Sequence, residues 1–181
     1  MTTLSKQQMA AAQEFANMTL TALKLPEGVH PATVVAAAAR MGGTYLFRSF
    51  GFKLTGIKPG QAVLSDGANK QGAQLIQIAG SVLSQVGIKL DNARSGEATN
   101  SKNKPILKFL DTQKKLEPLY APIKAHGKLS LEEAAQAVAV ATALLIKHCA
   151  KVLDPNVAFG IAVYGFVETA PEPVEISASA P

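Results

Sequence analysis

The stretch PATVVAAAARMGGTYLFRSFGF, residues 31–52, decides the fold, because it joins a helix start, a run of small residues and a dense group of aromatics. Pro31 suits the first turn of a helix, and Gly51 suits a left-handed stop at its end. Between them, the run VVAAAARMGG is small or apolar on nearly every side. Such a helix is typically surrounded by other helices. The sequence therefore predicts a central helix that reaches about Phe50.

Two glycines interrupt this predicted helix, and each costs about 1 kcal/mol relative to alanine in a helix interior. We expect the cost at Gly42 and Gly43 to be offset by another helix backbone, or by a ligand, that crosses at close range. The apolar segment 157–168 contains Gly160 and Gly165, which offer a matching small face. These four glycines are therefore predicted to form a close helix crossing.

Aromatic residues follow the glycines at high density. The group consists of Tyr45, Phe47, Phe50 and Phe52. Arg48 lies among them near the predicted helix end, where it can bond terminal carbonyls or a carboxylate. The aromatics either fill the core or, together with Tyr164, line an interface or a pocket. The sequence leaves open whether they face their own chain, a second copy or a ligand.

Capping signals mark two further helix starts. Ser5 with Gln8, and Ser130 with Glu133, each match the Ser-x-x-Glu/Gln capping box. Apolar residues recur at helical spacing after both boxes. We therefore expect a first helix after Ser5 and a long apolar helix after Ser130.

Three more helices are expected from apolar spacing and from proline and glycine positions. One spans about 66–86. Another begins at Pro105 and is interrupted by Pro118 and Pro122, because each proline removes a backbone donor and collides with the preceding turn. The composition of 157–168 favours a strand, but the start signal before it favours a helix, and a buried helix is our prediction.

The predicted architecture is all-α: a single helical-bundle-like domain of about six helices over residues 1–168. A long polar loop is expected at about 91–104, because that stretch has no apolar period. The segment 169–181 is rich in proline and alanine and is predicted to be a disordered tail.

Composition restricts the class of protein. The single cysteine, Cys149, excludes an intramolecular disulfide and a thiolate metal cluster. No apolar run reaches the roughly 18 residues of a spanning helix. The first residues show no apolar signal core. We expect a cytoplasmic protein.

The sequence predicts no catalytic residues. His148 and Cys149 are neighbours, but adjacent side chains on a helix point about 100° apart. The histidines His30, His126 and His148 are far apart, so no metal site is expected, and no cofactor is expected either. The stretch SDGANKQG, with Lys70, could hold an anion at a helix start, but it lacks the ending of a phosphate loop.

Positive charge is concentrated in one segment. Residues 102–128 hold seven lysines and two acidic residues, so this segment carries the whole net charge of +5. Lys104, Lys108 and Lys115, like Lys70, are candidate anion contacts. Nucleic acid is disfavoured, because lysine lacks the bidentate geometry of arginine. A solvated face and an acidic partner both fit the pattern.

Three functional hypotheses follow. The leading one is a non-enzymatic helical binding or scaffolding protein that forms a homo-oligomer. The alternative is an enzyme or carrier for a small apolar anionic ligand bound near Tyr45 and Arg48. The third is lysine-driven binding of nucleic acid or an acidic partner. Ligand, partner and oligomeric state are not specified by the sequence.

Overall fold

The computed structural model describes residues 4–51, 66–91 and 97–168, with side chains in the second range from residue 72 onward. Six α-helices and one small antiparallel sheet make up the described part, as predicted for an all-α fold. The elements are α1 (Lys6–Ala22), β1 (Lys24–Leu25), β2 (Gly28–Val29), α2 (Pro31–Ser49), α3 (Asp66–Gln85), the short 3₁₀ helix η2 (Ser101–Asn103), α4 (Phe109–His126), α5 (Leu131–Cys149) and α6 (Pro155–Val167). Phe52, the tail 169–181 and part of the predicted loop 91–104 lie outside the described residues.

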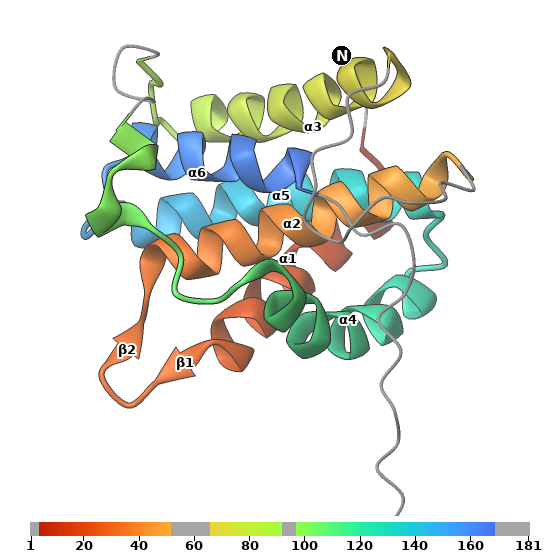
Figure 1. Ribbon diagram of the computed structural model, residues 1–181. Helices are drawn as coiled ribbons and strands as arrows, with labels where there is room; N and C mark the ends of the chain where they lie inside the picture. The colour runs from red at the N-terminus through yellow and green to blue at the C-terminus, as the bar shows by residue number, and fades with distance from the viewer. Residues whose placement is uncertain (1–3, 52–65, 92–96, 169–181) are drawn as a thin grey trace, which may run out of the picture.

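Helices α2 and α5 form the centre of the bundle. Figure 1 shows α3 across the top, α4 across the bottom and the β1–β2 hairpin at the lower left. α2 packs most extensively against α5 and α6, while α5 also contacts α1 and α3. Every α2 residue from 32 to 47 is buried. The all-round apolar run thus lies in a helix that is covered on all sides.

Both predicted capping boxes are present. The Ser5 hydroxyl accepts the Gln8 N–H at 3.1 Å, and the Gln8 side chain accepts the Ser5 N–H at 2.8 Å. Ser130 and Glu133 repeat the pattern at 3.1 and 2.8 Å. The starts of α1 and α5 are therefore fixed by local hydrogen bonds.

The ends of α2 also follow the predicted signals. Pro31 is the first helical residue, and His30 caps the helix by accepting the Thr33 N–H through Nδ1. At the other end, Gly51 has a φ of 63°, in the left-handed region that favours glycine. The central helix therefore has a defined start and a defined stop.

The prediction for α4 is wrong in two respects. The helix begins at Phe109 rather than at Pro105, because the Ile106 N–H is bound by the Thr33 hydroxyl of α2 at 2.8 Å. It also continues through Pro118 and Pro122. Both prolines are exposed, so the backbone carbonyls that lose a donor lie on the side of the helix that faces water.

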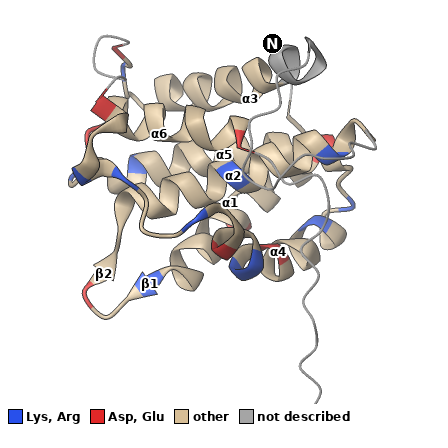
Figure 2. Cartoon of the chain, in the orientation of Figure 1, with Lys and Arg blue, Asp and Glu red and all other residues tan. Residues whose placement is uncertain are grey.

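Residues 155–167 form the helix that was expected over the strand alternative, but it is buried on one side only, because Tyr164 and Val167 are exposed. Figure 2 shows α6 without a basic or acidic residue. Within the described ranges, no single helix is long and apolar enough to cross a membrane. α4 and α5 meet that test only as a pair bent by 113°.

Candidate functional site

The glycines of α2 and α6 lie where these two helices touch. A Cβ atom placed on Gly43 would meet the backbone of α6, 2.9 Å from the Phe166 carbonyl carbon. A Cβ on Gly165 would lie 2.7 Å from the Ala39 Cβ of α2. A Cβ on Gly42 would lie 3.2 Å from the Phe166 ring. The two backbones therefore approach more closely than any side chain would allow.

The fourth glycine of the predicted crossing, Gly160, is buried in α6. Gly160 is not among the described residues that line the pocket described below. The crossing is made chiefly by the C-terminal half of α6, which brings Glu168, just after the helix end, beside the middle of α2.

Arg40 is a buried cation next to this crossing. Its side chain is 10% exposed. Nε donates to Oε2 of Glu168 at 2.5 Å, and Nη1 donates to the Leu107 carbonyl at 2.9 Å. Nη1 also lies 3.4 Å from the Thr112 hydroxyl. The guanidinium is thus held by α4 and by the segment before it on one side, and by a carboxylate on the other.

A pocket of about 290 Å³ opens beside Arg40, between α2, α6 and the segment 97–105. We call it the Arg40 pocket. Its lining consists of Ala36, Arg40, Ala98, Thr99, Lys104, Pro105, Ile161, Tyr164, Gly165 and Glu168. The lining therefore combines apolar and aromatic side chains with charged and hydroxyl groups, and each of the three elements contributes both kinds.

The predicted aromatic group is divided between core and surface. Tyr45 and Phe47 are each 3% exposed, and Phe50 is half-buried with its ring edge-on to Phe47 at 6.5 Å. Tyr164, in contrast, is 56% exposed and lines the Arg40 pocket. Tyr45 and Phe47 therefore belong to the core and present no surface to a partner.

Arg48 is engaged in an ion pair rather than in a pocket with Tyr164. Its guanidinium donates to both carboxylate oxygens of Glu117, at 2.5 and 3.4 Å. This bidentate pair joins α2 to α4. Burial, followed by the nearby Glu117 carboxylate, raises the pKa of Tyr45, whereas Arg48 opposes the rise. The arginine among the described lining residues of the pocket is Arg40, not Arg48.

Buried polar side chains also connect α1, α2 and α4. The Thr19 and Tyr120 hydroxyls lie 2.5 Å apart, and Gln113 Nε2 donates to the Thr44 hydroxyl at 2.7 Å. The Tyr45 hydroxyl and the Gln113 Oε1 are buried with no hydrogen-bond partner among the described residues. The hydrogen bonds between these side chains stabilise the bundle. None of the side chains named in this paragraph lines the Arg40 pocket.

The other candidate residues from the sequence, which are the cysteine, the histidines and the lysines, do not form a second site among the described residues. Cys149 is 2% exposed, and burial raises the pKa of its thiol. In the described ranges no three His, Cys, Asp or Glu side chains are grouped so that they could hold a metal ion. Of the candidate anion contacts, Lys104, Lys108 and Lys115 are exposed, and only Lys104 lines the Arg40 pocket. The side chain of Lys70 lies outside the described residues.

Sequence reasoning missed Arg40 and Glu168 as site residues. A signal was present, since a charged residue inside a helix that is covered on every side must find a partner. The identity of that partner was not readable, because Glu168 lies 128 residues away along the chain.

Comparisons of this chain with protein-family models, with curated proteins and with solved structures found no match. The candidate site therefore rests on the contacts, burial and charge described above.

Proposed function

We propose that this chain is a non-enzymatic helical binding protein that holds a small ligand in the Arg40 pocket. The observation that carries the proposal is the combination of a buried guanidinium with apolar and aromatic lining residues in one pocket. Small-molecule sites are typically apolar clefts with a few convergent polar groups that fix orientation. Arg40, Lys104 and Thr99 are the polar groups of this kind here.

The lining supports binding rather than covalent chemistry. Thr99 and Tyr164 supply hydroxyl groups, but the lining residues that the structure describes include no histidine or cysteine to activate them. Glu168, the carboxylate among the described lining residues, is hydrogen-bonded to Arg40. The volume, about 290 Å³, is at the lower end of the range for ligand pockets, which favours a compact ligand.

Thermal-shift screening against a metabolite set tests this proposal. A ligand at about 100 times its Kd adds ~2.7 kcal/mol, which raises the melting temperature by several degrees. Tyr164→Ala removes an exposed wall of the pocket, so compounds that stabilise the wild type are expected to lose their effect. Val167→Ala is the matched control, because Val167 is also exposed on α6 but does not line the pocket. Equal shifts in both variants, or no shift with any compound, would overturn the proposal.

We also propose that the protein is cytoplasmic and self-associates through the exposed apolar side of α6. Tyr164 and Val167 are 56% and 41% exposed on a helix that carries no charge, which supports a partner surface. Light scattering after gel filtration tests this: Val167→Lys is expected to reduce the mass to that of one chain. Val152→Lys, at a 76% exposed position outside α6, should leave the mass unchanged. A wild type that is monomeric at high concentration rules out self-association.

A further inference from the structure

The Arg40 pocket contains a carboxylate of the chain itself, that of Glu168, and its position against Arg40 indicates which class of ligand the pocket binds. We infer that the pocket binds a monocarboxylate with a compact apolar group, and that Glu168 competes with the ligand for Arg40. This inference rests on the proposed function, since it names the ligand class and the control of the same pocket. It follows from how the two edges of the guanidinium are held.

One edge of the guanidinium is fixed without Glu168. Nη1 of Arg40 donates to the Leu107 carbonyl at 2.9 Å and lies 3.4 Å from the Thr112 hydroxyl. Leu107 and Thr112 belong to the start of α4 and the residues before it, which are further bound to α2 through the Ile106 N–H. The cation is therefore positioned in advance, so a ligand does not have to order it.

The Nε edge of the guanidinium is the one that binds a carboxylate. It donates to Glu168 Oε2 at 2.5 Å, the geometry of a charge-assisted hydrogen bond. A buried cation needs such a counter-charge, because an unpaired one is strongly destabilising. A ligand carboxylate in the same position satisfies this need equally well, and Arg matches the planar carboxylate group better than Lys does.

Glu168 is suited to exchange with a ligand. Its side chain is 32% exposed, compared with 10% for Arg40, and it follows the last residue of α6 rather than lying within the helix. Once displaced, its carboxylate can return to water at little cost. Lys104, which is exposed and lines the same pocket, offers a second positive charge near either carboxylate.

The apolar lining residues restrict the rest of the ligand. Tyr164 supplies an aromatic ring, and Ile161, Pro105, Ala36 and Ala98 are apolar. We therefore expect a ligand whose aromatic ring packs against Tyr164 and whose short chain carries the carboxylate to Arg40. A suitable probe is therefore 3-phenylpropionate, and 3-phenylpropanamide is its neutral counterpart of nearly the same shape.

Calorimetric titration of both probes into the full chain and two variants tests the inference. Removing a competitor that occupies its site about nine-tenths of the time raises apparent affinity about tenfold. Glu168→Gln is accordingly expected to bind 3-phenylpropionate at least tenfold more tightly than the wild type does. The affinity for 3-phenylpropanamide should change less than twofold. Glu168→Asp, which keeps the charge on a shorter side chain, should fall between the wild type and Glu168→Gln.

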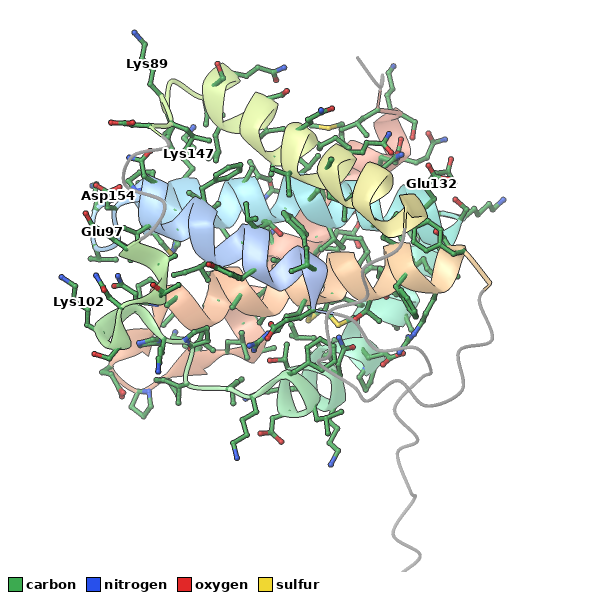
Figure 3. The ribbon with its side chains drawn as sticks, turned by 45° about the horizontal axis from the view of Figure 1, so that its top comes forward. Lys89, Glu97, Lys102, Glu132, Lys147 and Asp154 are labelled. Carbon is green, nitrogen blue, oxygen red and sulfur yellow. The ribbon has the colours of Figure 1, made fainter. Side chains whose placement is uncertain are left out.

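Glu132→Gln is the control for the loss of one negative charge. Figure 3 shows Glu132 at the opposite end of the bundle from Glu97, which begins the segment that lines the pocket. This control should bind both probes as the wild type does. Urea unfolding of each variant shows whether it is folded. If Glu168→Gln does not fold, the comparison is made between Glu168→Asp and the wild type.

The outcomes separate this inference from the proposed function. Equal binding of the acid and the amide by Glu168→Gln overturns the carboxylate assignment. An acid affinity unchanged between wild type and Glu168→Gln overturns the competition with Glu168. Absence of binding by either probe to the folded variants overturns the inference as a whole. In each case the proposed function is decided independently by the metabolite screen and its Tyr164→Ala arm.

Discussion

The hydroxyl groups of two buried tyrosines differ in their partners. The Tyr120 hydroxyl lies 2.5 Å from that of Thr19, which itself donates to the Phe15 carbonyl. The Tyr45 hydroxyl has no partner among the described residues. Burial raises the pKa of both phenols, so both keep their protons at neutral pH. One hydroxyl therefore stabilises the fold, while the other is desolvated without a hydrogen bond in return.

Phenylalanine at these two positions is expected to act in opposite directions. Tyr45→Phe removes an unpaired polar group and should raise the free energy of unfolding by about 1 kcal/mol. Tyr120→Phe removes the hydrogen bond to Thr19 and should lower it by about 1 kcal/mol. Urea denaturation monitored by circular dichroism measures both. A Tyr45→Phe variant that is less stable than Tyr120→Phe contradicts the assignment of partners.

At the scale of single residues, part of the site could be predicted from the sequence. Tyr164 was predicted to line a pocket or an interface, Lys104 to contact an anion and Gly165 to form a helix crossing, and all three line the Arg40 pocket. Arg40 was visible within the quoted stretch, but its role depends on Glu168, which no local pattern connects to it. Pairings over such sequence separations follow from packing, and a single sequence does not encode them in its periodicity.

Among the elements, the contact between α2 and α6 depends on glycine. A Cβ on Gly43 would meet the α6 backbone, which has no flexible end that can move aside. The small residues of α2 therefore allow the backbone of α6 to pack directly against it. The same contact brings Glu168 to Arg40, so the crossing also determines the shape of the pocket.

Gly43→Ala is expected to lower the free energy of unfolding by about 2 kcal/mol or more, because overpacking against backbone outweighs the gain in helix propensity. Gly80→Ala in α3 is the matched control, since its new Cβ would lie 3.7 Å from the Phe159 ring, an ordinary contact. This control should leave stability unchanged or raise it by up to about 1 kcal/mol. Urea unfolding measures the difference, and equal effects of the two substitutions would contradict the close crossing.

The capping box of α5 should give stability a pH dependence. Hydrogen bonds from the Ser130 backbone N–H, and then from its side chain, lower the pKa of Glu133. A carboxyl whose pKa is lowered on folding stabilises the fold above its ordinary value, here 4.5, and loses this contribution as the pH falls through the lowered value. Because Glu133 is exposed, the effect should be about 0.5 kcal/mol or less. Glu133→Gln should therefore be slightly less stable than wild type at pH 7, and the difference in the free energy of unfolding should disappear as the pH falls through the lowered pKa of Glu133. Urea unfolding at a series of pH values measures this, and a difference that does not change with pH contradicts the linkage.

The elements that were predicted correctly are those whose ends are fixed locally. Capping residues such as Ser5 and Ser130 lie within three residues of the groups they bond, so the sequence displays the whole interaction. The start of α4 is fixed instead by Thr33 and Arg40, which bind the segment before it from α2. That interaction overrides the proline signal at residue 105, and only the tertiary structure reveals it.

The whole molecule is arranged around a buried pair of helices. α2 and α5 contact each other and most other elements, whereas α3 and α4 lie at opposite sides of the bundle (Figure 1). Almost every residue of α2, and those from 134 to 143 in α5, are buried. The free energy of local opening should therefore be highest at the centre.

Native-state hydrogen exchange tests this hierarchy. Backbone amides in the middle of α2 and α5 are expected to exchange only through global unfolding, so their opening free energies should equal the value from urea denaturation. Amides of α4 should open at lower free energy, because its exposed prolines interrupt the hydrogen-bond ladder. Protection in α4 as high as that in α2 would contradict this ranking.

The position of α6 in the chain has a consequence for biosynthesis. During translation α2 precedes α5 and α6, the helices that cover it most extensively, which emerge from the ribosome later. Until they do, the small apolar face of α2 is open to other chains and to chaperones. Truncated nascent chains that end before α6 should therefore remain protease-sensitive, and the domain closes only after synthesis has passed Glu168.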